Sequence, residues 1–289
     1  MLTETELTEQ IIQHLSFSGF ASLLSLLTTW LAWQYGFFQK PCPLFPMVKG
    51  IEVLRGFALF LAFEIFIVPS LIALYFWFVW GQNIQQQIND TRQGWFNILA
   101  ILGGFIGVMM SIWLIPHSRR KLIWGDHLRW YRDFFMGIIS WFVSYPLVLV
   151  LGQVISIAVL IFSKETPSDQ TAVLQLKRIL NDSLLSKVTI LAIITLVPII
   201  EECLFRGLLQ SWLKYRIKSY PLAILITSLI FSLFHYSPSQ GITNIELLFS
   251  LFLLSCFLGY IYERQHSLWA PIGLHAFFNA MSVLMITQS

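Results

Sequence analysis

Charged residues are scarce in this sequence, and that scarcity excludes an ordinary soluble domain. They make up 11% of the 289 residues against 56% hydrophobic residues, and the mean hydropathy is +0.71. A typical globular domain carries roughly 25% charged residues. Several apolar runs reach the length of about 20 residues that a helix needs to cross a bilayer. The sequence therefore predicts an all-α, polytopic membrane protein.

Patterned cysteines, a basic leader and a single basic patch are also missing. The three cysteines, Cys42, Cys203 and Cys256, show no Cys-x-x-Cys spacing, so they predict neither a disulfide framework nor a zinc knuckle. The first sixteen residues contain glutamates but no Lys or Arg, unlike the basic start of a cleavable signal peptide. The positive residues sort into separate loops, so we expect membrane lipids as partners and no nucleic acid.

Eight apolar stretches are expected to cross the membrane. They cover residues 17–38, 51–80, 95–115, 134–162, 188–213, 221–236, 245–262 and 268–286. Residues 163–187 begin polar and then take on an amphipathic pattern, which predicts a short helix on the membrane surface. We divide the chain into residues 1–185, with the first four spans and this surface segment, and residues 186–289, with the last four spans.

The charges of the loops predict the orientation of the chain. If the N-terminus lies outside, the inside loops hold twelve Lys and Arg residues and the outside loops hold five. This distribution predicts a multi-pass integral protein of the plasma (inner) membrane with an external N-terminus.

Two glutamates and an arginine stand inside the fifth expected span, in the stretch LVPIIEECLFRG at 196–207. Charged side chains at bilayer depth are costly, so they mark a functional site by default. Glu202 and Arg206 share a helix face and can pair, whereas Glu201 lies about 100° around the axis. We interpret the first two as a structural ion pair and Glu201 as the working carboxylate. The alternative is that both glutamates only neutralise the arginine. Pro198 is expected to kink this span and free a backbone carbonyl.

The last spans carry further polar residues in two short motifs. Phe231 and His235 are one helical turn apart in FSLFH, and His275 and Asn279 are one turn apart in HAFFN. A lone histidine in an apolar helix is more often a hydrogen-bonded structural residue. Polar groups on three late spans nevertheless favour a shared interior site.

Depth in the membrane tests whether these residues can meet. Glu201 and His275 fall near the middle of their spans, but His235 comes out about 9 Å off centre at 1.5 Å per residue. The sixth span must therefore be tilted or shifted for the three to converge. Two other glutamates are expected elsewhere: Glu64 beside an interior donor, and Glu263 facing headgroups or water at the end of a span.

Taken in order, Glu-Glu-x-x-x-Arg-Gly, Phe-x-x-x-His and His-x-x-x-Asn resemble the three motifs of the CPBP family. These are the CAAX-prenyl-protease and bacteriocin-processing intramembrane proteases, also called the Abi family, and the resemblance covers residues 186–286. It implies an intramembrane endopeptidase that hydrolyses a peptide bond of a membrane-associated or lipidated protein or peptide. It also implies roles for single residues: Glu201 and His235 activate the attacking water, His275 and Asn279 stabilise the oxyanion, and Glu202, Arg206 and Phe231 support them.

Other chemistries and functions compete with this interpretation. Two histidines and a glutamate can ligate zinc with water as a fourth ligand, but His-Glu-x-x-His is missing and Asn279 suits an oxyanion better than zinc, so we expect no cofactor. A nucleophilic serine is excluded because Ser228 and Ser232 lack a Gly-x-Ser-x-Gly or rhomboid-like setting. A proton-coupled transporter predicts an inverted repeat, which is not evident. A catalytically silent membrane scaffold would not need all four catalytic residue types.

Overall fold

The computed structural model describes residues 4–41, 48–81, 89–163 and 171–288, and these residues form helices joined by turns, with no strand among them. The α-helices are α1 (Glu4–Gln34), α2 (Gly50–Leu61), α3 (Val68–Trp80), α4 (Asp90–Trp113), α5 (His117–Trp124), α6 (Trp130–Ser163), α7 (Thr171–Ile179), α8 (Ser183–Glu202), α9 (Ser211–Ile217), α10 (Tyr220–Leu233), α11 (Thr243–Gln265) and α12 (Trp269–Gln288). Two π-helices, η1 (Ala62–Ile67) and η3 (Cys203–Gln210), and one 3-10 turn, η4 (Pro238–Gln240), complete the described chain. The all-α prediction is confirmed. Cys42 lies outside the described residues.

Within the described chain, seven helices are long and apolar enough to cross a membrane. They are Glu4–Gln34, Gly50–Val79, Asp90–Trp113, Trp130–Ser163, Leu184–Ile217, Asn244–Gln265 and Trp269–Gln288. The protein is therefore a multi-pass integral membrane protein. Each of the seven corresponds to one of the eight expected spans.

The remaining expected span, 221–236, is a shorter helix than predicted. Helix α10 has 14 residues, which at 1.5 Å per residue makes about 21 Å against a hydrocarbon core of about 30 Å. The Ser219 side chain caps its start and Pro221 occupies its first turn, where proline is tolerated. The helix ends at Leu233, and the chain turns through η4 before α11 begins. His235 thus stands just beyond the end of a short helix.

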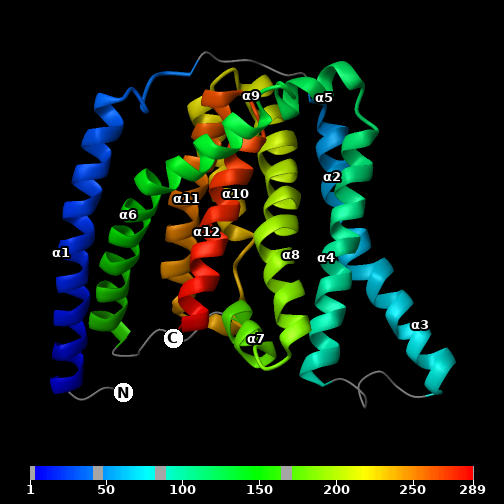
Figure 1. The fold of residues 1–289 in the computed structure, drawn as a ribbon, viewed down its shortest axis with the longest axis horizontal. Helices are drawn as coiled ribbons and strands as arrows, with labels where there is room; N and C mark the ends of the chain where they lie inside the picture. The colour runs from blue at the N-terminus through cyan, green and yellow to red at the C-terminus, as the bar shows by residue number, and fades with distance from the viewer. Residues whose placement is uncertain (1–3, 42–47, 82–88, 164–170, 289) are drawn as a thin grey trace.

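The chain passes back and forth so that both termini lie at the same end of the bundle (Figure 1). The continuous helix formed by α8 and η3 runs through its centre, and α4 packs against it on one side and α12 on the other. Helix α6 packs against α1, α11 and α12, so α1 lies at the periphery. Around the central helix, buried Val108, Leu204, Leu208 and Phe231 belong to the largest apolar cluster. The central helix therefore packs against other helices on several sides.

The peripheral helices turn large apolar side chains outward. In α1, Leu23 is 70% exposed, and in α3 Phe78 is 83% exposed. Apolar residues facing outward along whole helices match contact with lipid chains rather than water. The outer helices therefore form the surface that faces the membrane.

Three glycines of α4 allow the N-terminal helices to pack closely. A Cβ atom at Gly103 would lie 2.5 Å from a methyl group of Val68, and one at Gly107 would lie 2.7 Å from the carbonyl oxygen of Leu59. At Gly104 the neighbours would be Phe60 at 3.0 Å and the Glu64 carboxylate at 3.6 Å. The small-residue face of α4 thus lets α2, η1 and α3 approach it closely.

The amphipathic segment at 163–187 contains a short helix, as predicted. Helix α7 covers Thr171–Ile179, with Leu176 and Ile179 buried in a cluster that also includes Leu185. It packs against α4, α8 and α12 at the end of the bundle that holds the termini. Residues 164–170 lie outside the described part.

Helix α8 continues through Pro198 and ends at Glu202, where the wider π-helical turns of η3 begin. Because proline lacks an N–H group, it leaves one carbonyl a turn earlier without its helical partner. Single π-helical turns within α-helices occur frequently at functional sites. The two glutamates therefore stand at the junction between a proline-containing α-helix and a π-helix.

Candidate active site

Glu202 and Arg206 form a fully buried ion pair, as their spacing predicted. The guanidinium donates from Nη1 to Glu202 Oε1 at 2.9 Å, and both side chains are 0% exposed. Its Nη2 atom donates to the Ser255 hydroxyl at 2.7 Å and to the Ser255 carbonyl at 3.1 Å, and the group lies over the Phe231 ring at 4.8 Å. Helix α11, through Ser255, and helix α10, through Phe231, thus supply the remaining contacts that a buried arginine needs.

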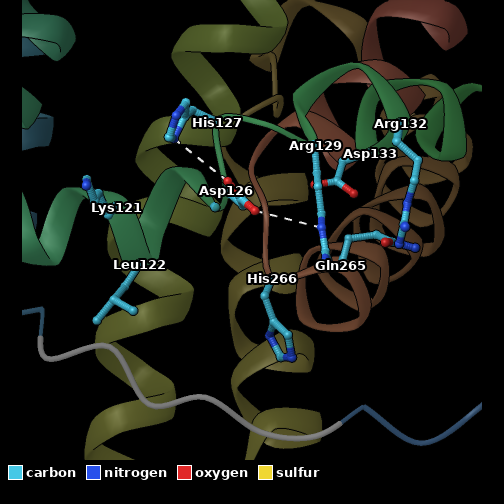
Figure 2. A pocket seen from close by; sticks show the side chains of 10 residues that line it. Lys121, Leu122, Asp126, His127, Arg129, Arg132, Asp133, Gln265 and His266 are labelled. Atoms are coloured by element: carbon cyan, nitrogen blue, oxygen red, sulfur yellow. Dashed lines mark ion pairs between the residues drawn. The ribbon is translucent and has the colours of Figure 1, made fainter.

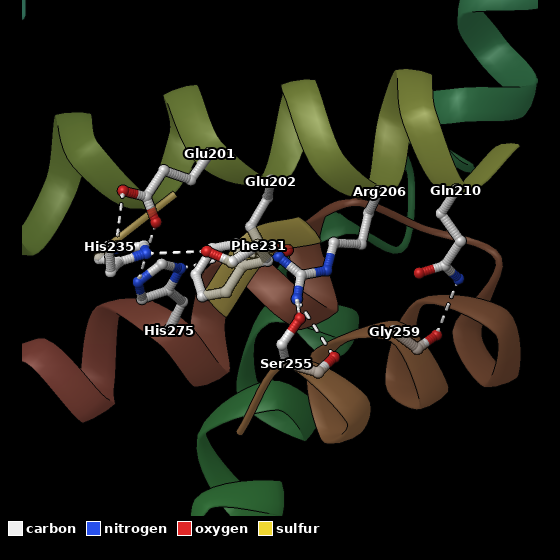
Figure 3. Close-up of polar contacts among 9 residues, drawn as sticks. All are labelled: Glu201, Glu202, Arg206, Gln210, Phe231, His235, Ser255, Gly259 and His275. Atoms are coloured by element: carbon white, nitrogen blue, oxygen red, sulfur yellow. Dashed lines mark hydrogen bonds and ion pairs between the residues drawn. The ribbon is translucent and has the colours of Figure 1, made fainter. Parts of the chain in front are cut away.

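Two more polar side chains follow at four-residue spacing, Gln210 on η3 and Lys214 on α9. Gln210 donates to the Gly259 carbonyl at 3.2 Å and to the Glu263 carboxylate at 2.9 Å (Figure 3). Lys214 donates to the other Glu263 oxygen at 2.6 Å, and Glu263 is 1% exposed. The prediction that Glu263 faces headgroups or water is wrong, because a buried lysine from α9 and a glutamine from η3 neutralise and bind its carboxylate.

Glu202 also holds His275. The imidazole donates from Nδ1 to Glu202 Oε1 at 2.8 Å, and the His275 side chain is 7% exposed. Arg206 and His275 therefore donate to the same carboxylate oxygen. Sequence reasoning assigned Glu202 to the arginine alone. A contact between helices so far apart in the chain has no spacing signal that could have revealed it.

Glu201 faces both histidines (Figure 3). Its Oε1 atom is 3.8 Å from His235 Nε2, and its Oε2 atom is 3.7 Å from His275 Nε2. Its side chain is 20% exposed, whereas Glu202 is fully buried. Both distances exceed direct hydrogen-bond length, and a water beside each pair could contact the carboxylate and the imidazole together. The structure therefore brings together Glu201, His235 and His275, from α8, the turn after α10, and α12.

The hydrogen bonds of the two histidines determine which ring nitrogen faces Glu201. His235 donates from Nδ1 to the Phe231 carbonyl at 2.9 Å, and His275 donates from Nδ1 to Glu202. A neutral imidazole has one N–H group and one lone pair. In the neutral form each histidine therefore turns a lone pair on Nε2 toward Glu201. The short α10 helix makes this possible, because it ends at the level of Glu201.

Asn279 lies one turn after His275 on α12 and contacts the central helix. Its amide nitrogen donates to the Ile193 carbonyl at 2.9 Å. An amide NH₂ group has two protons, so one is engaged with Ile193 and the other remains for a further acceptor. The structure thus places Asn279 beside the proline-containing part of α8, with no hydrogen bond to Glu201 or His275 among the described residues.

Glu64 is a further acidic group near the site. It lies on η1, and its carboxylate interacts electrostatically with that of Glu201. No hydrogen-bond donor or ion-pair partner of Glu64 occurs among the described residues, so the interior donor expected for it is not found there. The sequence signal for Glu64 was its position in an apolar span.

The arrangement can bind and deprotonate a water molecule between a carboxylate and an imidazole. In the described chain, no three His, Cys, Asp or Glu side chains are placed so that they could hold one metal ion. Ser228 and Ser232 are 1% and 3% exposed, and the Ser232 hydroxyl donates to the Leu229 carbonyl at 3.0 Å.

Comparison with known proteins identifies the domain that carries this site. Residues 183–281 match the family model of type II CAAX prenyl endopeptidase Rce1-like proteins. This match covers about a third of the chain and identifies residues 183–281 as an Rce1-like domain. The match includes all three motifs and leaves the helices before α8 outside. No curated protein and no solved structure gives a significant match to the chain.

Proposed function

We propose that this protein is an intramembrane endopeptidase in which Glu201 and His235 activate water. The observation that carries the proposal is the placement of the Glu201 carboxylate 3.8 Å from His235 Nε2 and 3.7 Å from His275 Nε2. An amide carbonyl resists attack by neutral water, so a base must accept a proton as the new bond forms. A water between Glu201 and His235 can donate one proton to each and direct a lone pair at the carbonyl carbon.

The path of the proton follows from this geometry. Glu201 accepts it as the water attacks, and the leaving amine must receive it when the peptide bond breaks. The Phe231 carbonyl accepts from His235 Nδ1, which leaves Nε2 as the acceptor toward the water. Glu201, once protonated, or His235 can then return the proton to the amine.

His275 and Asn279 are proposed to stabilise the oxyanion of the tetrahedral intermediate. His275 Nδ1 already donates to Glu202, so Nε2 becomes a donor when the ring is an imidazolium. Preorganised donors of this kind typically contribute about 3–4 kcal/mol each to lowering the barrier.

The proposed substrate is a membrane-associated or lipidated protein or peptide, because the site is formed within membrane-spanning helices and its domain is Rce1-like. The plasma (inner) membrane and an external N-terminus are proposed from the distribution of Lys and Arg between the loops. No cofactor is part of the proposed mechanism, and zinc is the alternative that the experiment below distinguishes.

The test is cleavage of lipidated and single-span peptides by the full chain in proteoliposomes. Glu201→Gln and His235→Ala should each lower kcat by about 10²–10⁴-fold, the range for general base catalysis. Glu246→Gln is the matched control, because it removes a carboxylate from α11 outside the site. Each variant is measured with and without a chelator.

The outcomes separate the hypotheses. Activity that both site variants abolish and that the chelator leaves unchanged supports the glutamate mechanism. Activity that is lost on chelation and restored by zinc replaces it with a metalloenzyme. If Glu201→Gln retains the activity of Glu246→Gln, the assignment of Glu201 as the base is wrong.

A further inference from the structure

A pocket of about 450 Å³ lined by several charged side chains lies at the end of the bundle opposite the chain termini (Figures 1 and 2). It is lined by the last residues of α5, the start of α6 and the turn between α11 and α12. Gly125 has a φ of 86°, and a Cβ there would lie 2.8 Å from the His266 carbonyl oxygen. Only glycine lets the α5–α6 connection approach the α11–α12 turn this closely. Gly125 thus allows the two sides of the pocket to lie in close contact.

Positive side chains outnumber negative ones around this pocket. Lys121, Arg129 and Arg132 face it together with Asp126 and Asp133, which leaves one positive charge in excess before either lining histidine is protonated. The side chains of Arg129 and Arg132 extend in the same direction and end near Gln265, and Lys121 lies on the other side (Figure 2).

The two carboxylates do not cancel this charge. Asp126 approaches Arg129 only to 3.8 Å and His127 to 3.8 Å, all three at exposed positions where such pairs are weak. Asp133 also lines the pocket, is 4% exposed and interacts electrostatically with Arg129 and Arg132. Neither Lys121 nor Arg132 has an ion-pair partner within 4.0 Å among the residues that the structure describes. Donors for an anion therefore remain at the pocket.

Aromatic side chains place the pocket at the level of a membrane–water interface. Trp269 packs against Trp124 at 5.4 Å and against Trp130 at 5.6 Å between ring centroids, and Trp130 is 48% exposed. Tryptophan and tyrosine gather at the headgroup level of membranes. Leu122, which lines the pocket, is 50% exposed, and Leu128, which lies in the chain between the lining residues His127 and Arg129, is 70% exposed. A ligand here meets charged donors and apolar side chains together.

We propose that this pocket binds the phosphate of an anionic phospholipid headgroup. A guanidinium matches phosphate geometry with two parallel hydrogen bonds, and Arg129 and Arg132 offer two such groups. Basic pockets between transmembrane helices are suited to anionic headgroups. A soluble phosphate would make no use of the exposed leucines and tryptophans, whereas the acyl chains of a lipid would cover them. The site is separate from Glu201 and lies outside the residues that the proposed chemistry uses.

The test uses the full chain purified in a neutral detergent and the rise of its Tm on titration with lipid. Phosphatidylglycerol is the anionic probe, phosphatidylcholine the zwitterionic one and inorganic phosphate the soluble one. Arg129→Gln/Arg132→Gln should raise the apparent Kd for phosphatidylglycerol at least about tenfold, since two charge-assisted contacts are lost. Arg216→Gln/Lys218→Gln is the matched control, because it removes two positive charges from the last turn and C-cap of α9 that do not line the pocket.

Saturable binding of phosphatidylglycerol that the pocket variant loses and the control variant keeps is the expected result. Equal losses in both variants would show diffuse surface charge and overturn the proposal. Equal affinity for phosphatidylcholine, or saturation by inorganic phosphate with no further effect of lipid, would also overturn the lipid assignment. Arg132→Lys keeps the charge without the planar fork, and it should bind with an affinity between the wild type and the double variant.

Discussion

The Oε1 atom of Glu202 accepts hydrogen bonds from both Arg206 at 2.9 Å and His275 at 2.8 Å. One buried carboxylate oxygen therefore joins the central helix to α12 and fixes the ring orientation of His275. This second contact goes beyond charge neutralisation. It makes Glu202 a positioning residue for a histidine whose Nε2 faces Glu201 at 3.7 Å.

The two roles of Glu202 can be separated by removing its cationic partner as well. Glu202→Leu alone should destabilise the protein by about 3–5 kcal/mol, because it leaves Arg206 buried without a counter-charge. Glu202→Leu/Arg206→Met should recover much of that stability, since a buried pair replaced by apolar residues is often neutral. We expect the double variant to remain inactive in the peptide-cleavage assay, because His275 has lost its acceptor. An active double variant, with Tm measured alongside, would mean that Glu202 only neutralises the arginine.

Local residue spacing in the sequence predicted the contacts within one helix. It did not predict the contacts that form when distant helices pack together. The four-residue spacing of Glu202 and Arg206 predicted their pair, and the helical angle placed Glu201 on another face. The contact of His275 with Glu202 joins residues 73 positions apart, and no local pattern encodes it. The same holds for Glu263. Its place at the end of a span predicted contact with headgroups or water, but its carboxylate pairs with Lys214 from another helix.

Helix length was the other difference between expectation and structure. The apolar run at 221–236 looks long enough for most of a crossing, yet α10 stops at Leu233. His235 lies just beyond the end of this helix, with its Nε2 atom 3.8 Å from Glu201. The π-helix at Cys203–Gln210 was not predicted, because its residues apart from Cys203 and Gly207 are common in ordinary α-helices.

Gly259 is predicted to be required by the contact with Gln210. A Cβ atom at Gly259 would lie 2.7 Å from Gln210 Oε1 and 3.1 Å from a methyl group of Ile224. Gly259→Ala should therefore destabilise the protein by about 1–3 kcal/mol, the usual cost of overpacking, although alanine is the better helix former. Gly19→Ala in α1 is the control, because nothing lies within 4 Å of its Cβ position. Thermal unfolding in detergent compares them, and a Gly259→Ala protein as stable as Gly19→Ala would contradict the close contact.

The buried Lys214–Glu263 pair is predicted to be strongly non-additive. Lys214→Met leaves the Glu263 carboxylate, which is 1% exposed, with Gln210 as its remaining donor. We expect a loss of about 3–5 kcal/mol for this variant and a much smaller loss for Lys214→Met/Glu263→Leu. A double-mutant cycle of unfolding free energies measures the coupling. If the two single losses simply add in the double variant, the pair does not act as one buried unit.

His266 is predicted to make stability depend on pH. Burial lowers the pKa of this imidazole below its ordinary value, Lys214 acts in the same direction, and Glu263 opposes it. The unfolded chain therefore holds more protons than the folded protein between the two pKa values. This contribution to stability is complete above the unfolded pKa of about 6.5 and is lost as the pH falls toward the folded pKa.

His266→Asn should flatten that pH dependence, and asparagine suits the positive φ of 53° at this position. The measurement is Tm from neutral pH to about pH 5 for wild type and variant. His127→Asn is the control, since this histidine is 81% exposed. A wild-type slope that persists unchanged in His266→Asn would assign the effect to another group.

Asn279 is predicted to affect kcat far more than stability. Its observed hydrogen bond to the Ile193 carbonyl is a single neutral contact, and losing such a contact costs about 0.5–1.5 kcal/mol. A donor to the oxyanion is worth about 10²–10³-fold in kcat. Asn279→Ala should therefore lower Tm slightly, leave KM nearly unchanged and reduce kcat in that range. Ser282→Ala is the matched control on α12, because it also removes one hydrogen bond to a backbone carbonyl, that of Phe278 at 2.9 Å. If the two variants lose kcat equally, Asn279 only ties α12 to the central helix, and the oxyanion donor must be sought elsewhere.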